Sequence, residues 1–153
     1  MAKLTIKGID TYIEGLQALS DATDEELGKA IYKGADIVAD AARAAIQSLP
    51  VGHNPIRGEI EPEQKDGLLD GLGIASMQLK GTELNVKLGM DGYNSKGQPN
   101  SMILRSIEAG TSWPNGRGRP ATPIIKRAVQ KTRKQAEEAM VKAFEEAINR
   151  RMK

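Results

Sequence analysis

The spacing of apolar residues predicts a strand and two helices in the first third of the chain. Apolar and polar side chains alternate over residues 3–7, which predicts a short half-buried strand. Apolar residues then recur at helical spacing over 10–19 and over 23–49, which predicts a short helix followed by a long one. At the start of the long helix, Thr23 and Glu26 have the spacing of a capping box. We therefore expect the second helix to begin at Thr23.

The middle of the chain predicts two loops with a hairpin between them. Residues 50–66 are rich in proline and glycine and have no periodicity, which predicts a long mobile loop. Over residues 68–90 the period falls to two, with a slip near Ser76-Met77, which predicts an antiparallel hairpin with one bulge and a turn over 80–83. Residues 91–100 are again turn formers, and we expect a second mobile loop there.

The last third predicts a short helix, a loop and a long C-terminal helix. Residues 102–109 have helical spacing, and Gly110 stops that helix. Thr122 is a good N-cap and Pro123 a good first helical residue, and an apolar stripe continues from there to the C-terminus. These elements predict a single α+β domain over residues 1–153. In it, a small antiparallel sheet is packed by a long helix of the N-terminal half and a long C-terminal helix.

The residue types of the chain argue against a catalytic function. The chain has no cysteine, which excludes a disulfide scaffold, a thiol nucleophile and cysteine-ligated metal sites. His53 is its one histidine and lies in the predicted 50–66 loop, so we expect no histidine pair and no metal cluster. Glu59, Glu61 and Glu63 alternate in the same loop and fit a solvated acidic segment better than a fixed acid–base pair. We predict that the chain is not an enzyme and has no catalytic residue, cofactor or metal.

Large apolar side chains are scarce. Five of the 153 residues are aromatic, whereas 18 are alanine. Because aromatic side chains supply much of the buried area of most cores and interfaces, we expect a thin aliphatic core that neighbouring subunits help to cover. No segment has the roughly 18 consecutive apolar residues of a membrane span, and no signal-peptide pattern is present. We therefore expect folding in a cytoplasm and no membrane partner.

The net charge of +2 is distributed unevenly along the chain. Residues 1–115 hold 11 basic and 16 acidic side chains, a net charge of −5, whereas residues 116–153 hold 11 basic and 4 acidic, a net charge of +7. Much of this positive charge falls in the first turns of the C-terminal helix, at Lys126, Arg127, Lys131, Arg133 and Lys134. Cations there oppose the helix dipole, so the cluster needs an explanation. It could contact DNA phosphates, join copies of the chain, or form a solvated face.

Residues 106–128 resemble a motif of a viral protein family. The motif combines a (Val/Ile)-Glu-x-Gly-Thr-Ser phrase, a short Gly/Pro loop, an Arg-Pro-(Ala/Phe)-x-x-Pro phrase and a closing helix. In this chain the matching segments are residues 107–112 (IEAGTS) and 119–123 (RPATP). Upstream, residues 66–69 (DGLL) open the predicted hairpin. The layout resembles the neck and tail-completion proteins of tailed bacteriophages, also described as head–tail joining or minor tail proteins. One departure is the absence of the tyrosine that members often carry shortly before the glutamate.

The resemblance implies a structural virion protein without enzymatic activity. It implies a ring in the neck that joins or completes the tail at the head–tail junction, and six-fold symmetry is suggested by the family alone. The partners would be further copies of the chain, the head connector, and the tail tube or tail terminator proteins. Genomic DNA would pass through the channel only as cargo. Assembly would take place in the cytoplasm of a bacterial host, and the final location would be the virion neck or tail.

The residues expected at the subunit interface fall into two groups. The first belongs to the loop before the last helix and the second to the basic cluster. They are Glu108, Gly110, Thr111, Trp113, Arg119, Pro120, Lys131, Arg133 and Lys134. We expect Glu108 to pair with Arg119, in the same chain or the next one, and Gly110 to adopt a positive φ at the helix end. The alternative function is a DNA-binding module that uses the basic C-terminal helix.

Overall fold

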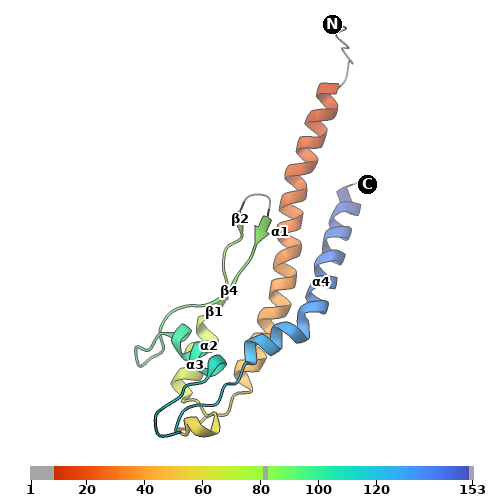
Figure 1. Cartoon of the computed structure of the whole chain (residues 1–153). Helices are drawn as coiled ribbons and strands as arrows, with labels where there is room; N and C mark the ends of the chain where they lie inside the picture. Colours follow the sequence, from red (N-terminus) through yellow and green to blue (C-terminus); the bar gives the residue numbers. More distant parts are fainter. Residues whose placement is uncertain (1–8, 81–82, 152–153) are drawn as a thin grey trace.

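A computed structural model describes residues 9–80 and 83–151 of the chain (Figure 1). The predicted strand over 3–7 and the middle of the predicted turn over 80–83 lie outside the described residues. The elements in chain order are α1 (Ile9–Gln47), a short 3-10 helix η1 (Pro55–Arg57), α2 (Pro62–Gly71), β1 (Leu72–Ile74), β2 (Gln78–Lys80), β3 (Glu83–Asn85), β4 (Leu88–Met90), α3 (Asn100–Ala109) and α4 (Ile124–Arg151). The predicted α+β class is therefore confirmed.

Helix α1 is one continuous helix of 39 residues, so the predicted break before Thr23 is wrong. The segment over 16–27 contains neither glycine nor proline. Inside a helix, Ser, Asp and Thr each destabilise the helix by only about 0.5 kcal/mol relative to good helix formers. A capping pattern permits a helix to start but does not force one to stop, and here the helix continues through it.

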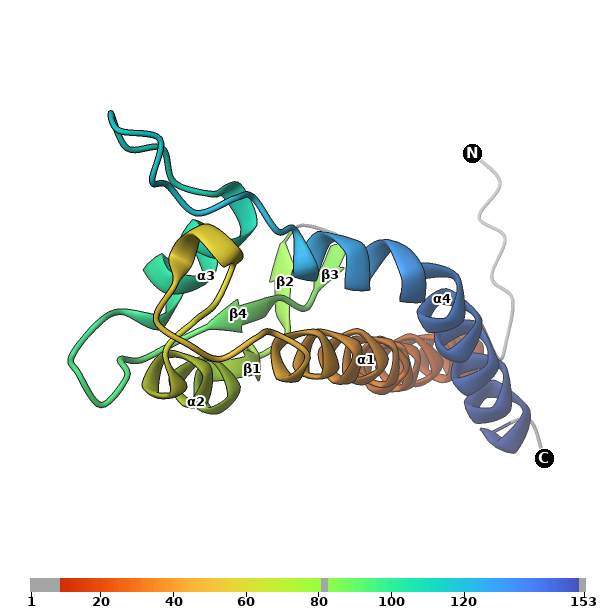
Figure 2. The same ribbon diagram turned by 90° about the horizontal axis from the view of Figure 1, so that it is seen from below.

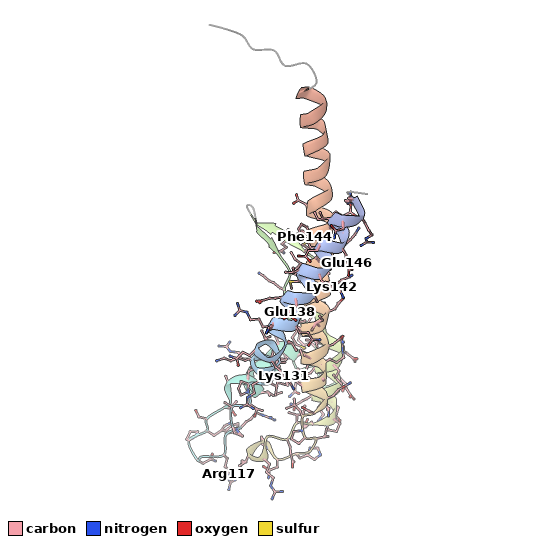
Figure 3. The ribbon with its side chains drawn as sticks, turned by 90° about the vertical axis from the view of Figure 1, so that its right-hand side faces the viewer. Arg117, Lys131, Glu138, Lys142, Phe144 and Glu146 are labelled. Carbon is pink, nitrogen blue, oxygen red and sulfur yellow. The ribbon has the colours of Figure 1, made fainter. Side chains whose placement is uncertain are left out.

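Helices α1 and α4 run side by side, and the N-terminal turns of α1 extend past the end of α4 (Figures 1 and 3). Six of the buried positions along the pair are alanine: Ala30, Ala39 and Ala42 in α1, and Ala128, Ala136 and Ala147 in α4. Small side chains let two helices approach closely but bury little apolar area per residue. Val129, which belongs to the apolar stripe predicted for the last helix, is 39% exposed.

Helix α4 bends after its first turns, as Figures 1 and 2 show. The Thr132 hydroxyl donates a hydrogen bond of 2.7 Å to the carbonyl oxygen of Ala128, four residues earlier. Such a bond competes with the helical ladder and bends helices. As a result, the first turns of α4, which carry the basic cluster, cross the last turns of α1, and the remaining turns follow α1 lengthwise.

Helix α2 replaces the second half of the predicted 50–66 loop and the predicted start of the hairpin. Pro62 occupies its first turn, a position where proline is favoured. The side chain of Gln64 accepts a hydrogen bond of 3.2 Å from the backbone N–H of Glu61, as in a capping box. Glu61, Pro62 and Glu63, which suggested a loop, are instead the start signals of a short helix, which leaves only 50–61 as the connection from α1.

The hairpin prediction is confirmed, with a longer interruption than the expected bulge. Strand β1 pairs antiparallel with β4, and β2 pairs antiparallel with β3. Between the two ladders the chain leaves the sheet over 75–77, where the hydroxyl oxygen of Tyr32 accepts a hydrogen bond of 2.7 Å from the backbone N–H of Met77. The hairpin is thereby attached to the side of α1.

The hydrophobic core lies where the C-terminal end of α1 meets α2, α3 and the start of α4. Its fully buried side chains are Ile46, Ile60, Leu68 and Ile107. The buried residues of this cluster are aliphatic, as expected from the composition, whereas Tyr93 and Trp113 are exposed. Within the described part of the chain, no helix combines the length and apolar character needed to cross a membrane. The core fixes the two segments that carry the candidate site.

Candidate interaction site

The junction of α3 and α4 is held together by backbone conformation and short hydrogen bonds. Gly110 ends α3 with φ 73° and ψ 172°, a region essentially restricted to glycine, which confirms the predicted positive φ. The chain then leaves in a loop over 111–119. Its two ends are joined because the backbone N–H of Thr111 donates to Arg119 O, and the backbone N–H of Arg119 donates to Thr111 Oγ1, each at 3.0 Å.

The carboxylate of Glu108 caps α4 from outside that helix. Its Oε1 accepts a hydrogen bond of 2.6 Å from the backbone N–H of Ile125, in the first turn of α4. The predicted N-cap is therefore wrong, because the Thr122 hydroxyl donates to Pro120 O at 3.4 Å instead. A negative charge at this position offsets the repulsion between the helix dipole and the neighbouring cations. Glu108 thus supplies the missing explanation for a basic first turn.

Arg119 is buried and bonded to a distant segment. Its guanidinium donates to the carbonyl oxygens of Gly58 and Glu59, the former at 3.2 Å, and the residue is 9% exposed. Burial lowers the pKa of the Arg119 guanidinium from its ordinary value. The expected pair between Glu108 and Arg119 is absent within the described chain, since each side chain bonds to a different backbone group.

The tip of the 111–119 loop is a tight turn that presents Trp113. The backbone N–H of Gly116 donates to Trp113 O at 3.0 Å, and Gly116 has a positive φ of 70°. A Cβ at Gly118 would lie 1.8 Å from Thr111 O, so only glycine fits where the two arms of the loop pass each other. Trp113 is 63% exposed, and Figure 2 shows the loop between α3 and α4 projecting from the body of the molecule. The loop is braced at its base and open at its tip.

A pocket of about 580 Å³ lies between this loop, α3 and the 52–64 segment. Its lining mixes apolar groups with charged and amide side chains: Pro55, Ile103 and Trp113 with His53, Glu59, Glu61, Gln64, Asn115, Arg117 and Arg119. At its rim, the Lys96 ammonium lies 2.7 Å from Glu61 Oε2, and His53 Nδ1 lies 3.7 Å from Glu61 Oε1. The hydrogen bond from Lys96 holds the pKa of Glu61 below its ordinary value, and the same contact raises the pKa of Lys96.

The basic cluster of α4 forms a second surface. Its five cations, Lys126, Arg127, Lys131, Arg133 and Lys134, are exposed. Arg133 pairs with Glu137 of the same helix at 2.9 Å, while the others have no ion-pair partner among the described residues. Figure 3 places Arg117 at the end of the molecule and Lys131 farther along α4, with Glu138, Lys142 and Glu146 succeeding it toward the C-terminus. Cations therefore dominate the first part of α4, whereas glutamates alternate with Lys142, Arg150 and Arg151 in the rest.

The structure thus separates the nine predicted interface residues into two places. Glu108, Gly110, Thr111 and Arg119 belong to one hydrogen-bonded junction, with Trp113 on the same loop and Pro120 exposed directly after it. Lys131, Arg133 and Lys134 lie on the exposed side of α4, outside the pocket lining. Their role between subunits remains a prediction.

Sequence reasoning missed the contribution of the 52–61 segment to this site. The carbonyls of Gly58 and Glu59, and the side chains of His53 and Glu61, come from a region about sixty residues before Arg119. The one local signal is Gly58, which adopts a positive φ of 77° at the turn that carries these carbonyls. Among the described residues, no three His, Asp or Glu side chains are placed to hold a metal ion.

Comparison of the chain with protein-family models, with curated proteins and with solved structures gave no match.

Proposed function

We propose that this chain is a structural protein of a tailed-bacteriophage virion, which forms a ring in the neck and joins or completes the tail at the head–tail junction. The observation that carries the proposal is the construction of residues 106–128, the segment that resembles the family. Glu108, Thr111 and Arg119 each brace the 111–119 loop and the start of α4. The motif residues therefore hold a projecting loop in place, which suits a contact surface better than catalysis.

The charge distribution supports head-to-tail contact between copies. Asp24, Glu25, Asp36 and Asp40 are exposed on α1, whereas the exposed cations cluster on the first part of α4. In a ring, one face of each subunit meets a different face of the next, so two surfaces of opposite charge on one chain are useful. The alanine-lined pairing of α1 with α4 adds little apolar burial, and further burial against neighbours would stabilise the subunit.

The proposal predicts rings that depend on the basic cluster. Electron microscopy and light scattering after size exclusion should show a closed oligomer for the purified chain at moderate salt. The triple reversal Lys131→Glu, Arg133→Glu and Lys134→Glu should shift the population to monomers, because it replaces attraction by repulsion. A control reverses three exposed cations outside α1 and α4, at Arg57, Lys87 and Arg105, and changes the net charge equally.

Two results would count against the proposal. If the chain stays monomeric at every concentration, alone and with connector or tail proteins, the proposed ring is contradicted. If rings persist in the triple variant but dissociate in the control, the basic cluster is not needed for ring formation.

DNA binding by α4 is the second candidate, favoured by the five exposed cations on one stretch of helix. Phosphate contacts would give binding that weakens steeply as salt rises. Anisotropy of a labelled duplex, titrated with monomeric protein at low salt, separates the two candidates. Binding that is lost in the triple reversal would favour DNA contact, and no binding at low salt would exclude it.

A further inference from the structure

Arg119 is a buried cation without an anionic partner in the described chain. Its guanidinium has five N–H groups, and two hydrogen bonds, to the carbonyl oxygens of Gly58 and Glu59, are formed. No carboxylate of the described residues forms an ion pair with it. A buried charge is costly unless it is paired. The remaining N–H groups belong to a side chain that lines the 580 Å³ pocket, so an anion entering the pocket can reach them.

The carboxylates of the pocket are occupied by other groups. Glu59 Oε2 accepts a hydrogen bond of 3.0 Å from the backbone N–H of Asn54. Glu61 accepts from Lys96 at 2.7 Å. Lys96 contacts both Glu61 and Glu63, so Lys96, Arg117 and Arg119 stand beside Glu59, Glu61 and Glu63, and the charges of this region balance. Glu59 and Glu61 already accept hydrogen bonds from other groups, which leaves Arg117 and Arg119 as the lining cations that can bind an anion. The nearby glutamates repel a phosphate dianion more strongly than a monoanion.

The rest of the lining fits an organic acid rather than a bare ion. Trp113, Ile103 and Pro55 offer apolar surface next to the arginines, and Asn115 and Gln64 offer amide groups. A guanidinium binds a carboxylate through two parallel hydrogen bonds, which favours that group among monoanions. We propose that this pocket is a binding site for a carboxylate, held by Arg117 and Arg119, with its carbon chain against the ring of Trp113.

The carboxylate can come from an acidic side chain of another protein chain or from a small organic acid. The pocket is open to solvent beside the 111–119 loop, so either source can enter it. Figure 2 shows this loop projecting from the body of the molecule. The proposal does not depend on the ring, because binding is measured on the isolated chain.

Trp113 gives a direct readout, since it is the one tryptophan of the chain and lines the pocket. Its emission is followed while three probes are added separately: succinate, inorganic phosphate, and a blocked peptide of residues 21–26 (DATDEE) with an Asn/Gln counterpart as control. We expect saturable changes with succinate or with the acidic peptide, and none with the neutral peptide. Binding of the peptide but not succinate identifies a protein partner, and the reverse identifies a small acid.

The variant Arg117→Gln should weaken that binding about tenfold or more, the cost of a lost charge-assisted hydrogen bond. Arg117 is exposed, so this variant should fold, and circular dichroism checks that it does. A second variant, Arg119→Lys, keeps the charge but loses the planar fork and should weaken binding similarly. The matched control Arg127→Gln removes an exposed arginine outside the pocket and should leave binding unchanged.

Several outcomes would overturn the proposal. No saturable change with either carboxylate probe would leave Arg119 as a structural clamp of the 58–59 carbonyls. Tighter binding of phosphate than of either carboxylate would contradict the assigned ligand class. An equal loss of binding in Arg117→Gln and Arg127→Gln would show a general charge effect rather than a site.

Discussion

At the scale of single residues, the α3–α4 junction depends on a few side chains that act on backbone groups. Glu108 caps a helix that begins sixteen residues later, and Arg119 satisfies carbonyls of a loop sixty-one residues earlier. Gly110 supplies the turn that brings these groups together. Each residue of the motif thus has a structural task, and the exposed Trp113 is left as the group available for contact.

The cap by Glu108 gives the first stability prediction. The variant Glu108→Ala removes both the hydrogen bond to Ile125 and the charge at the helix N-terminus, and should lower the free energy of unfolding by about 1–2 kcal/mol. Glu108→Gln keeps an acceptor oxygen and should lose less. Urea unfolding followed by circular dichroism measures both variants.

The control for this prediction is Glu138→Ala, which removes an exposed carboxylate from α4 without a described ion-pair partner. Its effect should stay within about 0.5 kcal/mol, as for most surface changes. Equal effects of Glu108→Ala and Glu138→Ala would show that the cap contributes nothing.

At the scale of elements, the pairing of α1 with α4 has few large side chains to hold it and one long-range ion pair near the C-terminal end of α4. Arg151 donates to Glu26 Oε1 at 3.1 Å, and Lys29 approaches the same carboxylate at 3.4 Å. The hydrogen bond from Arg151 holds the pKa of Glu26 below its ordinary value, and Lys29 lowers it further. The ion pair therefore links the two helices far from the core.

This pair predicts a pH dependence with a defined sign. Because the pKa of Glu26 is lower in the folded chain than in the unfolded one, its contribution is complete above the ordinary glutamate pKa of about 4.3. The contribution disappears as the pH falls through the lowered, folded-state pKa. The variant Arg151→Gln should thus be less stable than the natural chain at pH 7, and the difference should shrink toward pH 3. Urea midpoints across this range measure it.

The neighbouring Arg150 is a close control, since it bonds only to a carbonyl of its own helix, that of Glu146, at 3.4 Å. Arg150→Gln should show no such pH-dependent difference. A constant difference between Arg151→Gln and the natural chain at all pH values would mean that Glu26 is not the group involved.

At the scale of the whole molecule, the fold is a small aliphatic core at one end and a long helical pair that extends from it (Figure 1). Exposed apolar side chains occur on α4, where Val129 is 39% and Val141 57% exposed. A monomer of this shape leaves apolar surface in water that neighbouring copies can cover. The shape is consistent with the proposed ring.

The ring predicts that stability depends on concentration. Association that involves only the folded chain raises the melting temperature as concentration rises. Calorimetry or circular dichroism between about 5 and 500 µM should therefore show an upward shift, by mass action on the folded oligomer. The triple reversal at Lys131, Arg133 and Lys134 should show a smaller shift. A melting temperature independent of concentration in the natural chain would contradict the proposed assembly.

The sequence by itself determined the features that depend on near neighbours in the chain. The helical spacing over 102–109, the glycine that ends it and the apolar stripe of the last helix all predict what the structure contains, because periodicity and caps act within a few residues. The alternation over 68–90 likewise predicts the hairpin strands, though not helix α2, whose proline-rich start resembles a loop.

The tertiary structure alone decided the continuity of α1, the cap on α4 and the pocket. A capping pattern at Thr23 is compatible with a helix start or a helix interior, and in the structure Thr23 lies in the interior of α1. The partner of Glu108 is a backbone N–H, and the partners of Arg119 are backbone carbonyls, so no residue type at either position signals the contact. Such bonds depend on which segments the core brings together, and that arrangement exists only once the whole chain is folded.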